Sequence, residues 1–289
     1  MLMKACSLRD AAAPAGHPFD GGLPAPQPLH CLAPMKTSAL FLFSKRLLAG
    51  ICGLLCTLAH AGTVQVAVAA NFSAPMQKIA AAFEKATGHT AVLSFGATGK
   101  FYAQIRNGAP FAVLLAADDE TPARLLKDGL AVPGSTFTYA TGQLALWSRR
   151  PGLVDDKGQV LRAPLPGKLA VADPRLAPYG AAALQALDKL GLLDKLRPQF
   201  VVGENIGQTF QFVKTDNAAL GFVALSQIME GGRITAGSAW VVPATLYEPI
   251  RQEAALLKAG EDNAAAKALL QYLRGDAARQ VMRAYGYEF

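Results

Sequence analysis

The sequence predicts an α/β protein of two lobes, each a mostly parallel sheet flanked by helices, with a ligand cleft between the lobes. Three observations lead to this prediction. Short apolar, strand-like runs alternate with helical patterns at the spacing of parallel βα units. A polar, turn-rich stretch at 149–166 separates a first α/β series from a second. After residue 247 the chain adds a strand and two helices, which we expect to complete the first lobe.

The first series begins with an apolar strand at 64–68 and an amphipathic helix at 76–85. Gly88 closes that helix, because glycine readily adopts the left-handed conformation that ends many helices. A strand-like stretch follows later, at 139–148. The other predicted elements of this series are strands at 90–93 and 111–116 and helices at 101–107 and 121–127.

The second series repeats the alternation after the polar stretch. We predict strands at 168–171, 200–202 and 220–224, and helices at 181–190 and 208–215. The C-terminal part consists of a strand at 250–256 and helices at 263–274 and 276–285. On this basis we expect lobe I to comprise 62–141 and 248–289, and lobe II to comprise 142–247.

The N-terminal region has the pattern of a secretory signal peptide. Two basic residues, Lys45 and Arg46, precede a short apolar run at 47–58, and small residues then form a cleavage site near Ala61. We assign 35–61 to the signal peptide and 1–34 to a mis-called or disordered extension. The apolar run is too short to span a bilayer well. We therefore expect a periplasmic protein without stable membrane insertion after cleavage, rather than one with a retained anchor.

Cysteine and charge content exclude several classes of site from the mature chain. All four cysteines lie before Ala61, so a disulfide framework, a thiolate metal site and a cysteine nucleophile are not expected. The full chain carries a formal net charge of +7, and because five basic and two acidic residues lie before Ala61, the mature chain carries +4. No dense basic run remains, so we expect no nucleic-acid partner.

Two polar loops follow neighbouring strands of the first series, each at a point where a strand passes into a helix. They occupy 69–74 and 94–100. The start of a helix offers unpaired backbone N–H groups and the positive end of its dipole, so two adjacent loops of this kind form a candidate anion site. The second series supplies matching loops at 172–180 and 203–208, and ligands of such sheets lie outside the carboxyl ends of the strands.

Other chemistry has less support in these residues. The loop at 96–100 is not an NTPase phosphate loop, because Ser94 and Phe101 stand where that motif needs Gly and Ser or Thr. A tight turn with a solvated lysine remains an alternative to the anion site at this loop. The acidic run at 118–120 fits helix capping better than metal ligation. Tyr179, taken alone, fits a lid residue and a surface aromatic equally well.

A series of short strings resembles the molybdate-binding proteins of bacterial ABC uptake systems, over 63–287. The strings are AANF at 69–72, SFGATGK at 94–100, QIRNGAPF at 104–111, ADP at 172–174, APYG at 177–180, GENI at 203–206 and GFVALS at 221–226. Each string alone is weakly specific. Their order and spacing together are typical of the family.

The resemblance implies a type II periplasmic binding protein fold that holds molybdate or tungstate between its lobes by neutral hydrogen-bond donors. Carried over position by position, Asn71 and Thr98 donate through side chain and backbone N–H, and Tyr179 and Ile206 donate through backbone N–H. They meet the metal only through the oxyanion oxygens, and Lys100 is not expected to touch the ligand. The resemblance further implies no cofactor, an ABC transporter permease as partner, a monomer, and no enzymatic activity.

Two alternatives stay open. One is a binding protein for another anion such as sulfate, which has the charge and shape of molybdate but shorter bonds. The other is a secreted two-lobed α/β hydrolase, which would need a nucleophile, a base or a metal set near the loops. The mature chain has no cysteine, no Gly-x-Ser-x-Gly elbow and a single histidine, His89.

Overall fold

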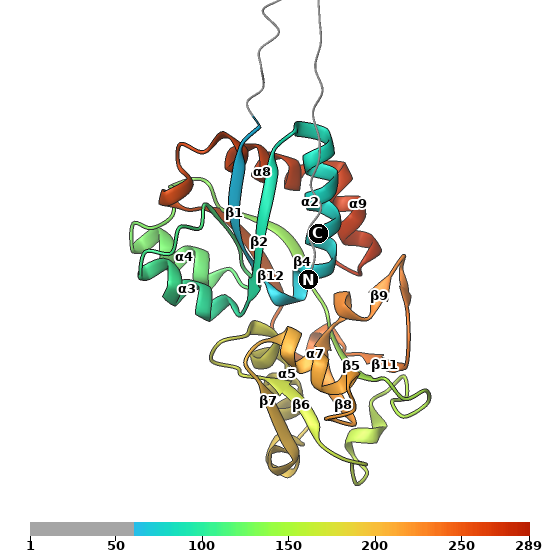
Figure 1. Cartoon of the computed structure of the whole chain (residues 1–289). Coiled ribbons are helices and arrows are strands. Elements are labelled where there is room, and N and C mark those ends of the chain that lie inside the picture. The colour runs from blue at the N-terminus through green and yellow to red at the C-terminus, as the bar shows by residue number, and fades with distance from the viewer. Residues whose placement is uncertain (1–60) are drawn as a thin grey trace, which may run out of the picture. The chain divides into compact units, whose positions relative to one another are not determined.

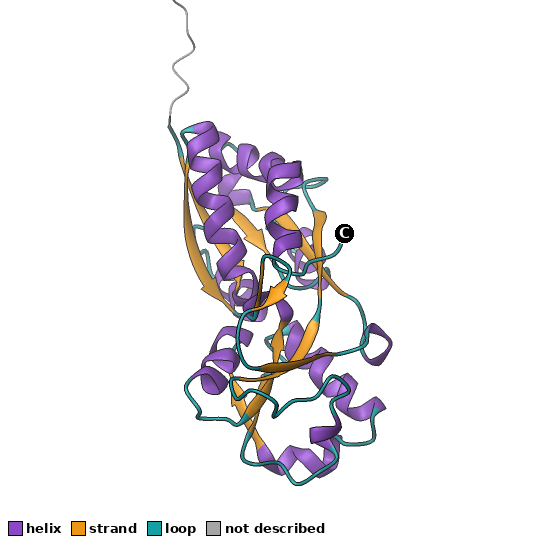
Figure 2. Ribbon diagram, turned by 90° about the vertical axis from the view of Figure 1, so that its right-hand side faces the viewer, coloured by secondary structure: helices purple, strands orange, loops and turns teal. Residues whose placement is uncertain are grey.

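Two five-stranded sheets with helices on both faces organise the chain (Figure 1, Figure 2). The computed structural model describes residues 61–289, which belong to one compact unit. The predicted extension at 1–34 and the signal peptide up to residue 60 lie outside the described residues. The predicted α/β class is confirmed.

The first sheet has the strand order β2-β1-β3-β12-β4. Its strands are β1 Thr63–Ala69, β2 Thr90–Gly96, β3 Val113–Leu115, β4 Phe137–Gly142 and β12 Ile250–Leu256. The strands β2, β1 and β3 are parallel neighbours, whereas β12 pairs antiparallel with both β3 and β4. Four of the five strands therefore run in one direction, and the strand from the C-terminal part runs against them.

Side chains of the first sheet alternate between two cores. On β1, Val64, Val66 and Val68 face one core and Ala67 faces the other, which is the period of two of a strand. Burial on both faces explains why these strands read as apolar runs in the sequence. One face is covered by α2 Ser73–Thr87, α8 Ala264–Arg274 and α9 Asp276–Ala284, and the other by α3 Thr98–Arg106 and α4 Glu120–Lys127 (Figure 1).

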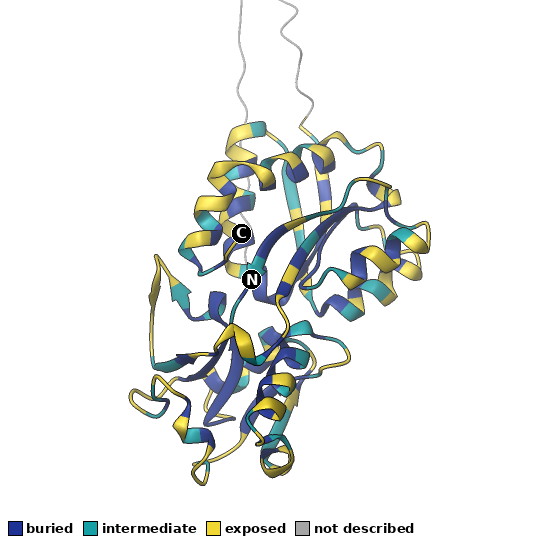
Figure 3. Ribbon diagram, turned by 180° about the vertical axis from the view of Figure 1, so that it is seen from behind, coloured by how far each residue is buried: buried dark blue, intermediate teal, exposed yellow. Residues whose placement is uncertain are grey.

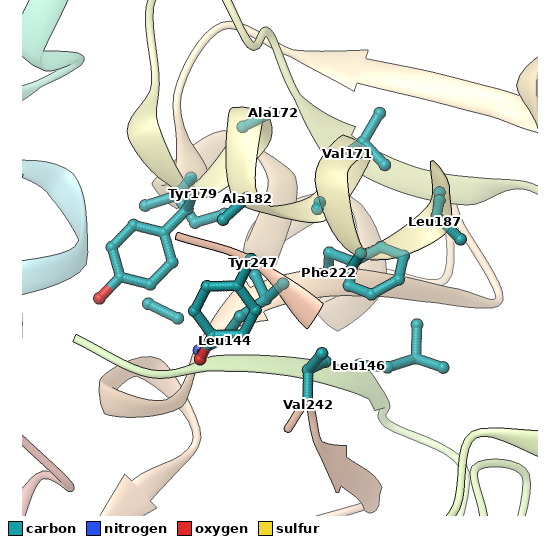
Figure 4. Close-up of a cluster of buried hydrophobic side chains, with 14 of the residues drawn as sticks. Leu144, Leu146, Val171, Ala172, Tyr179, Ala182, Leu187, Phe222, Val242 and Tyr247 are labelled. Atoms are coloured by element: carbon teal, nitrogen blue, oxygen red, sulfur yellow. The ribbon is translucent and has the colours of Figure 1, made fainter. Parts of the chain in front are cut away.

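The second sheet has the strand order β11-β5-β8-β6-β7. Its strands are β5 Leu144–Ser148, β6 Leu169–Ala172, β7 Phe200–Gly203, β8 Leu220–Ala224 and β11 Ser238–Val241. Here β5 is the strand that runs against the other four. Helix α5 Pro178–Lys189 packs on one face, where Figure 4 shows Leu187 and Phe222 together, and α7 Ile206–Lys214 packs on the other.

The chain passes between the sheets at two places. Only Gln143 separates β4 from β5, so the single strand-like stretch predicted at 139–148 is divided between the two sheets. The return from β11 to β12 includes the 3-10 helix η5 Ala244–Leu246. Any motion of one sheet against the other has to bend these two connections.

Four helices begin two or three residues earlier than the sequence pattern indicates. Apolar periodicity predicted starts at residues 76, 101, 181 and 208, whereas α2, α3, α5 and α7 begin at Ser73, Thr98, Pro178 and Ile206. Gly, Pro, Ser or Thr interrupts the apolar pattern in each of these first turns, so the periodic pattern starts late. As a result, residues expected in loops lie in the first turns of helices.

Several short elements were not predicted, among them β11 and the antiparallel pair β9 Met229–Glu230 and β10 Arg233–Ile234. Figure 3 shows that the inner strands of both sheets are mostly buried, whereas edge strands such as β2 are only partly buried and the helices expose their outer sides. Within residues 61–289 no helix combines the length and apolar character that a membrane span requires. The remaining elements are η1 Ala70–Phe72, η2 Gln159–Leu161, α6 Leu193–Leu196, η3 Arg197–Gln199, η4 Leu225–Gln227 and η6 Lys258–Gly260.

Candidate anion-binding site

The four residues predicted to hold the ligand all lie at the start of a helix. Asn71 is the second residue of η1 and Thr98 the first of α3, both next to the first sheet. Tyr179 is the second residue of α5 and Ile206 the first of α7, both next to the second sheet. The first N–H groups of a helix have no carbonyl partner within it, and the helix dipole adds partial positive charge there.

One small cavity brings the four residues together. About 10 Å³ of it is open to the centre of a water-sized sphere, close to the minimum that holds one ordered water. This volume counts only the positions of the sphere's centre, and the cavity wall lies one water radius beyond them. The size of the cavity therefore suits a compact ion and is too small for an organic solute. It is lined by Ala69, Ala70, Asn71, Gly96, Ala97, Thr98, Ala117, Ala177, Pro178, Tyr179, Asn205 and Ile206.

The described residues that line this cavity include no Asp, Glu, Lys, Arg or His. Lys100, two residues after Thr98, instead forms an ion pair with Glu204, with 2.6 Å between Nζ and Oε2. Both side chains of the pair are about half exposed. The field inside the cavity therefore comes from backbone dipoles and neutral polar groups, an arrangement that can hold an anion.

The backbone orients the hydroxyl group of Thr98. Its Oγ1 accepts a hydrogen bond of 3.0 Å from the Ala117 N–H, and Thr98 is buried. This bond uses a lone pair of the oxygen and leaves the hydroxyl hydrogen for another acceptor. Since Thr98 and Ala117 both line the cavity, the hydroxyl group can donate into it.

The side chain of Asn71 is engaged by the protein. Its Nδ2 donates to Gln252 Oε1 at 2.8 Å and to Tyr287 Oη at 2.9 Å. Both amide hydrogens are used in these two bonds. In this arrangement Asn71 offers the cavity its backbone N–H but no side-chain donor, which differs from the role that the resemblance implied for its side chain.

Tyr179 is neither a lid residue nor a surface aromatic. It is only 1% exposed, and its ring packs in the core of the second sheet. Figure 4 shows its phenol oxygen pointing away from that core, and the oxygen accepts a hydrogen bond of 2.9 Å from Gln252 Nε2. Pro178 fixes a backbone angle suited to the first helical position. The N–H of Tyr179, in the same first turn, has no carbonyl partner within the helix, and Tyr179 lines the cavity.

The start of α7 is fixed by a helix cap. Asn205 Oδ1 accepts a hydrogen bond of 2.9 Å from the Gln208 N–H. An N-cap side chain of this kind satisfies one of the unpaired N–H groups of the first turn. The cap leaves the N–H of Ile206, the first residue of the helix, available at the cavity.

The sequence analysis missed a buried polar network beside the cavity. It joins Tyr139, Gln252 and Tyr287 to Tyr179 and Ser226, and all of them are buried. Ser226 belongs to one of the strings that carried the resemblance. Gln252 lies in an otherwise ordinary strand, and no sequence signal marks it.

A larger cavity adjoins the small one and shares Ala117, Ala177 and Pro178 with it. It has a volume of about 340 Å³, and side chains of both charges line it. Asp118 is one of them, and burial raises the pKa of its carboxyl group. This carboxyl group accepts hydrogen bonds from the Thr121 N–H at 2.9 Å and Oγ1 at 3.2 Å, which holds the first turn of α4 as the capping interpretation expects.

Comparisons with known proteins agree with this geometry. A family model described as bacterial extracellular solute-binding protein matches residues 64–288. The chain is 56% identical over 247 residues to the molybdate-binding protein ModA of Azotobacter vinelandii, covering 86% of this chain and 98% of the relative. It is 51% identical over 231 residues to the molybdate-binding protein ModA of Rhodobacter capsulatus, covering 79% and 89%. The solved structure of a periplasmic molybdate-binding protein of Azotobacter vinelandii matches with a TM-score of 0.76 and 42% identity, covering 78% of this chain and 99% of that one.

Proposed function

Because the chain belongs to the bacterial extracellular solute-binding proteins, and within them to the molybdate-binding proteins, we propose that it captures molybdate or tungstate in the periplasm and delivers the anion to the permease of an ABC importer. The close relatives are binding proteins rather than enzymes. The observation that carries the proposal is the small, neutral cavity where four helix starts meet.

Neutral donors can replace the water shell of a dianion. Burying such an ion without partners would cost many kcal/mol. Each charge-assisted hydrogen bond contributes roughly 1.5–3 kcal/mol, and the backbone N–H groups of Asn71, Thr98, Tyr179 and Ile206 supply several, with the Thr98 hydroxyl as a further donor. A shell of this kind offsets the desolvation of the anion and leaves net binding.

The chemistry of the donors predicts which anions are rejected. A protonated anion places an O–H against another donor, so phosphate, which carries a proton at neutral pH, should bind poorly. Sulfate has the same charge and shape as molybdate, with shorter bonds, so only the size of the cavity can exclude it. Molybdate and tungstate are nearly equal in size, and we expect both to bind.

Contacts between the two sheet-based lobes support a closed, ligand-retaining form. The Gly99 N–H donates to the Leu176 carbonyl at 3.1 Å, and Ser226 Oγ donates to the Asn71 carbonyl at 2.8 Å. Each of these bonds joins a residue beside the first sheet to one beside the second. We propose that the lobes close around the anion as in other two-lobed binding proteins, and that the permease binds the closed form.

Isothermal titration calorimetry of the chain from residue 62 onward tests the proposal with molybdate, tungstate, sulfate and phosphate. We expect tight binding of molybdate and tungstate, weak binding of sulfate, and poor but measurable binding of phosphate at high concentration. Tighter binding of sulfate than of molybdate would make the chain a binding protein for another anion. An absence of molybdate binding would overturn the proposal.

A further inference from the structure

The oxygen of the Asn71 side chain has no hydrogen-bond partner, although the residue is only 2% exposed. Within residues 61–289 it is the only buried side-chain nitrogen or oxygen in that condition. A buried acceptor without a partner costs about 1–3 kcal/mol, so such an atom needs an explanation. Asn71 lines the anion cavity, which connects the unpaired atom to the site.

The partners of the Asn71 nitrogen imply that the unpaired oxygen is the side-chain atom nearer the cavity. The Asn71 Nδ2 faces Gln252 and Tyr287, and neither of these residues lines the cavity. The other arm of the planar amide, Oδ1, is the one left toward it. An acceptor directed at an anion repels it, so this arrangement opposes anion binding.

Gln252 decides which way the Asn71 amide points. Its Oε1 accepts from Asn71 Nδ2 at 2.8 Å and from Tyr139 Oη at 2.9 Å, while its Nε2 donates to Tyr179 Oη at 2.9 Å. As long as Gln252 presents its oxygen, Asn71 must present its nitrogen in return. The two amides therefore form one unit that can only turn together.

A half-turn of both amides gives the Asn71 oxygen hydrogen-bond partners and keeps the amides bonded to each other. Gln252 Nε2 then donates to Asn71 Oδ1, and Gln252 Oε1 accepts from the Tyr179 hydroxyl group. Tyr139 still donates to the Ala116 carbonyl, with 3.0 Å between oxygens, and Tyr287 donates to Asn71 Oδ1. The Asn71 nitrogen is then directed at the cavity with both hydrogens free.

The three phenols can make this exchange because they keep their hydrogens. Burial raises the pKa of Tyr287 to about 12, and burial also raises the pKa values of Tyr139 and Tyr179. A neutral phenol both donates and accepts, so each can reverse its role without a change of charge.

The strand geometry places Gln252 for this role. The pairing of β12 with β4 shifts register between Gln252 and Glu253, which leaves Tyr139 as an extra residue opposite that step. Such bulges redirect side chains, and here the Tyr139 hydroxyl group meets the Gln252 amide. Gln252 is completely buried, so no solvent competes for its amide.

We infer that Gln252 is a positioning residue, and that anion capture turns the amides of Gln252 and Asn71 together so that Asn71 becomes a donor to the anion. The inference rests on the proposed function. It explains how Asn71 can donate to an anion although its nitrogen bonds to Gln252 in the arrangement described. Selectivity against protonated anions then depends on Gln252, which does not touch the ligand.

The Gln252→Glu variant tests the inference, because an ionised carboxylate can only accept hydrogen bonds. It holds the Asn71 nitrogen toward itself, and the Asn71 oxygen then stays directed at the cavity. Titrations use molybdate and inorganic phosphate at a pH where phosphate is a singly protonated dianion. The added negative charge repels molybdate and hydrogen phosphate alike. The Asn71 oxygen, in contrast, can accept a hydrogen bond from the O–H of hydrogen phosphate, whereas molybdate has no O–H to donate. We expect molybdate affinity to fall at least about tenfold, and the phosphate-to-molybdate affinity ratio to rise by at least about tenfold.

Gln143→Glu is the matched control, since Gln143 lies between β4 and β5 and is only partly buried. It introduces the same charge near the lobe connection and should keep the wild-type ratio. If the wild type binds molybdate but Gln252→Glu has the wild-type phosphate-to-molybdate affinity ratio, the inference is overturned and the proposed function is not. If the wild type does not bind molybdate, the proposed function fails instead.

A second pair of variants covers the case in which Gln252→Glu does not fold. Tyr139→Phe removes the hydroxyl group whose oxygen accepts from Gln252 Nε2 after the turn, whereas before the turn Gln252 Oε1 keeps Asn71 Nδ2 as its partner. We therefore expect molybdate affinity to fall about three- to tenfold. Tyr247→Phe removes a buried hydroxyl group that accepts from the Leu144 N–H and lies outside the unit, so affinity should be retained. Equal affinities of the two variants would contradict the inference.

Discussion

Gly142 lies against the phenol oxygen of Tyr179, with no room for a Cβ atom between them. Gly142 is the last residue of β4, next to the connection between the two sheets, and Tyr179 lies in the first turn of α5 beside the second sheet. A Cβ at position 142 would also overlap Gln252 Nε2. The absence of a side chain at Gly142 is therefore a condition for the buried network to form.

The Gly142→Ala variant should lose about 1–3 kcal/mol of unfolding free energy, because overpacking forces buried groups apart. It should also bind molybdate more weakly, since the displaced groups hold both the Tyr179 helix start and Asn71. Urea unfolding and calorimetry measure the two effects. Gly62→Ala is the control, because a Cβ there meets only ordinary contacts of 3.4 Å or more. Equal stabilities of the two variants would contradict this account.

The Thr98→Val variant should weaken molybdate binding by about 1–3 kcal/mol. Valine keeps the shape of threonine but removes the hydroxyl donor, and it leaves the Ala117 N–H without its acceptor. Thr98→Ser should keep most of the affinity. Thr121→Val removes a buried hydroxyl group outside the small cavity, so it should lower stability and spare binding. A neutral Thr98→Val would mean that the hydroxyl group does not face the anion.

The Lys100→Met variant should change molybdate affinity by less than about 1 kcal/mol, because its ion pair with Glu204 is half exposed and such pairs contribute little. The small loss should vanish at high salt. Titrations at two salt concentrations measure it, with Lys258→Met as the control, since Lys258 forms an equally exposed pair with Glu261. A loss of tenfold or more would place Lys100 at the ligand.

The Asp118→Asn variant should be stabilised relative to the wild type at neutral pH but not at about pH 4. Burial raises the pKa of the folded carboxyl group above its ordinary value of 3.8. Between these two values the folded state binds more protons than the unfolded state, so wild-type stability falls as pH rises through that window. Asparagine keeps an acceptor for Thr121 and has no charge to desolvate.

Urea unfolding of wild type and Asp118→Asn at the two pH values measures the difference. The gain of the variant should be larger at neutral pH. A gain that is the same at both values would show that titration of Asp118 does not contribute to stability.

Much of the fold could be predicted from local patterns. Apolar runs such as 64–68 and 220–224 mark strands buried on both faces, and the structure has strands there at Thr63–Ala69 and Leu220–Ala224. The pattern placed the start of α3 at residue 101 instead of Thr98, since Thr98, Gly99 and Lys100 carry no apolar periodicity. The N–H groups of such a first turn are free because no carbonyl of the same helix precedes them.

The sequence by itself determined the α/β class and the polar loops at strand-to-helix junctions, because strand burial and helix starts leave a mark within a few residues. The four residues that the structure gathers around one cavity came from the resemblance of short sequence strings to a known family. Only the tertiary structure decided the surroundings of Asn71. Its partner Gln252 is distant in the chain, and the contact between them forms only where β12 returns to the first sheet. Since no periodicity encodes a contact between residues so far apart, the unpaired Asn71 oxygen and the amide that controls it became visible only in the folded chain.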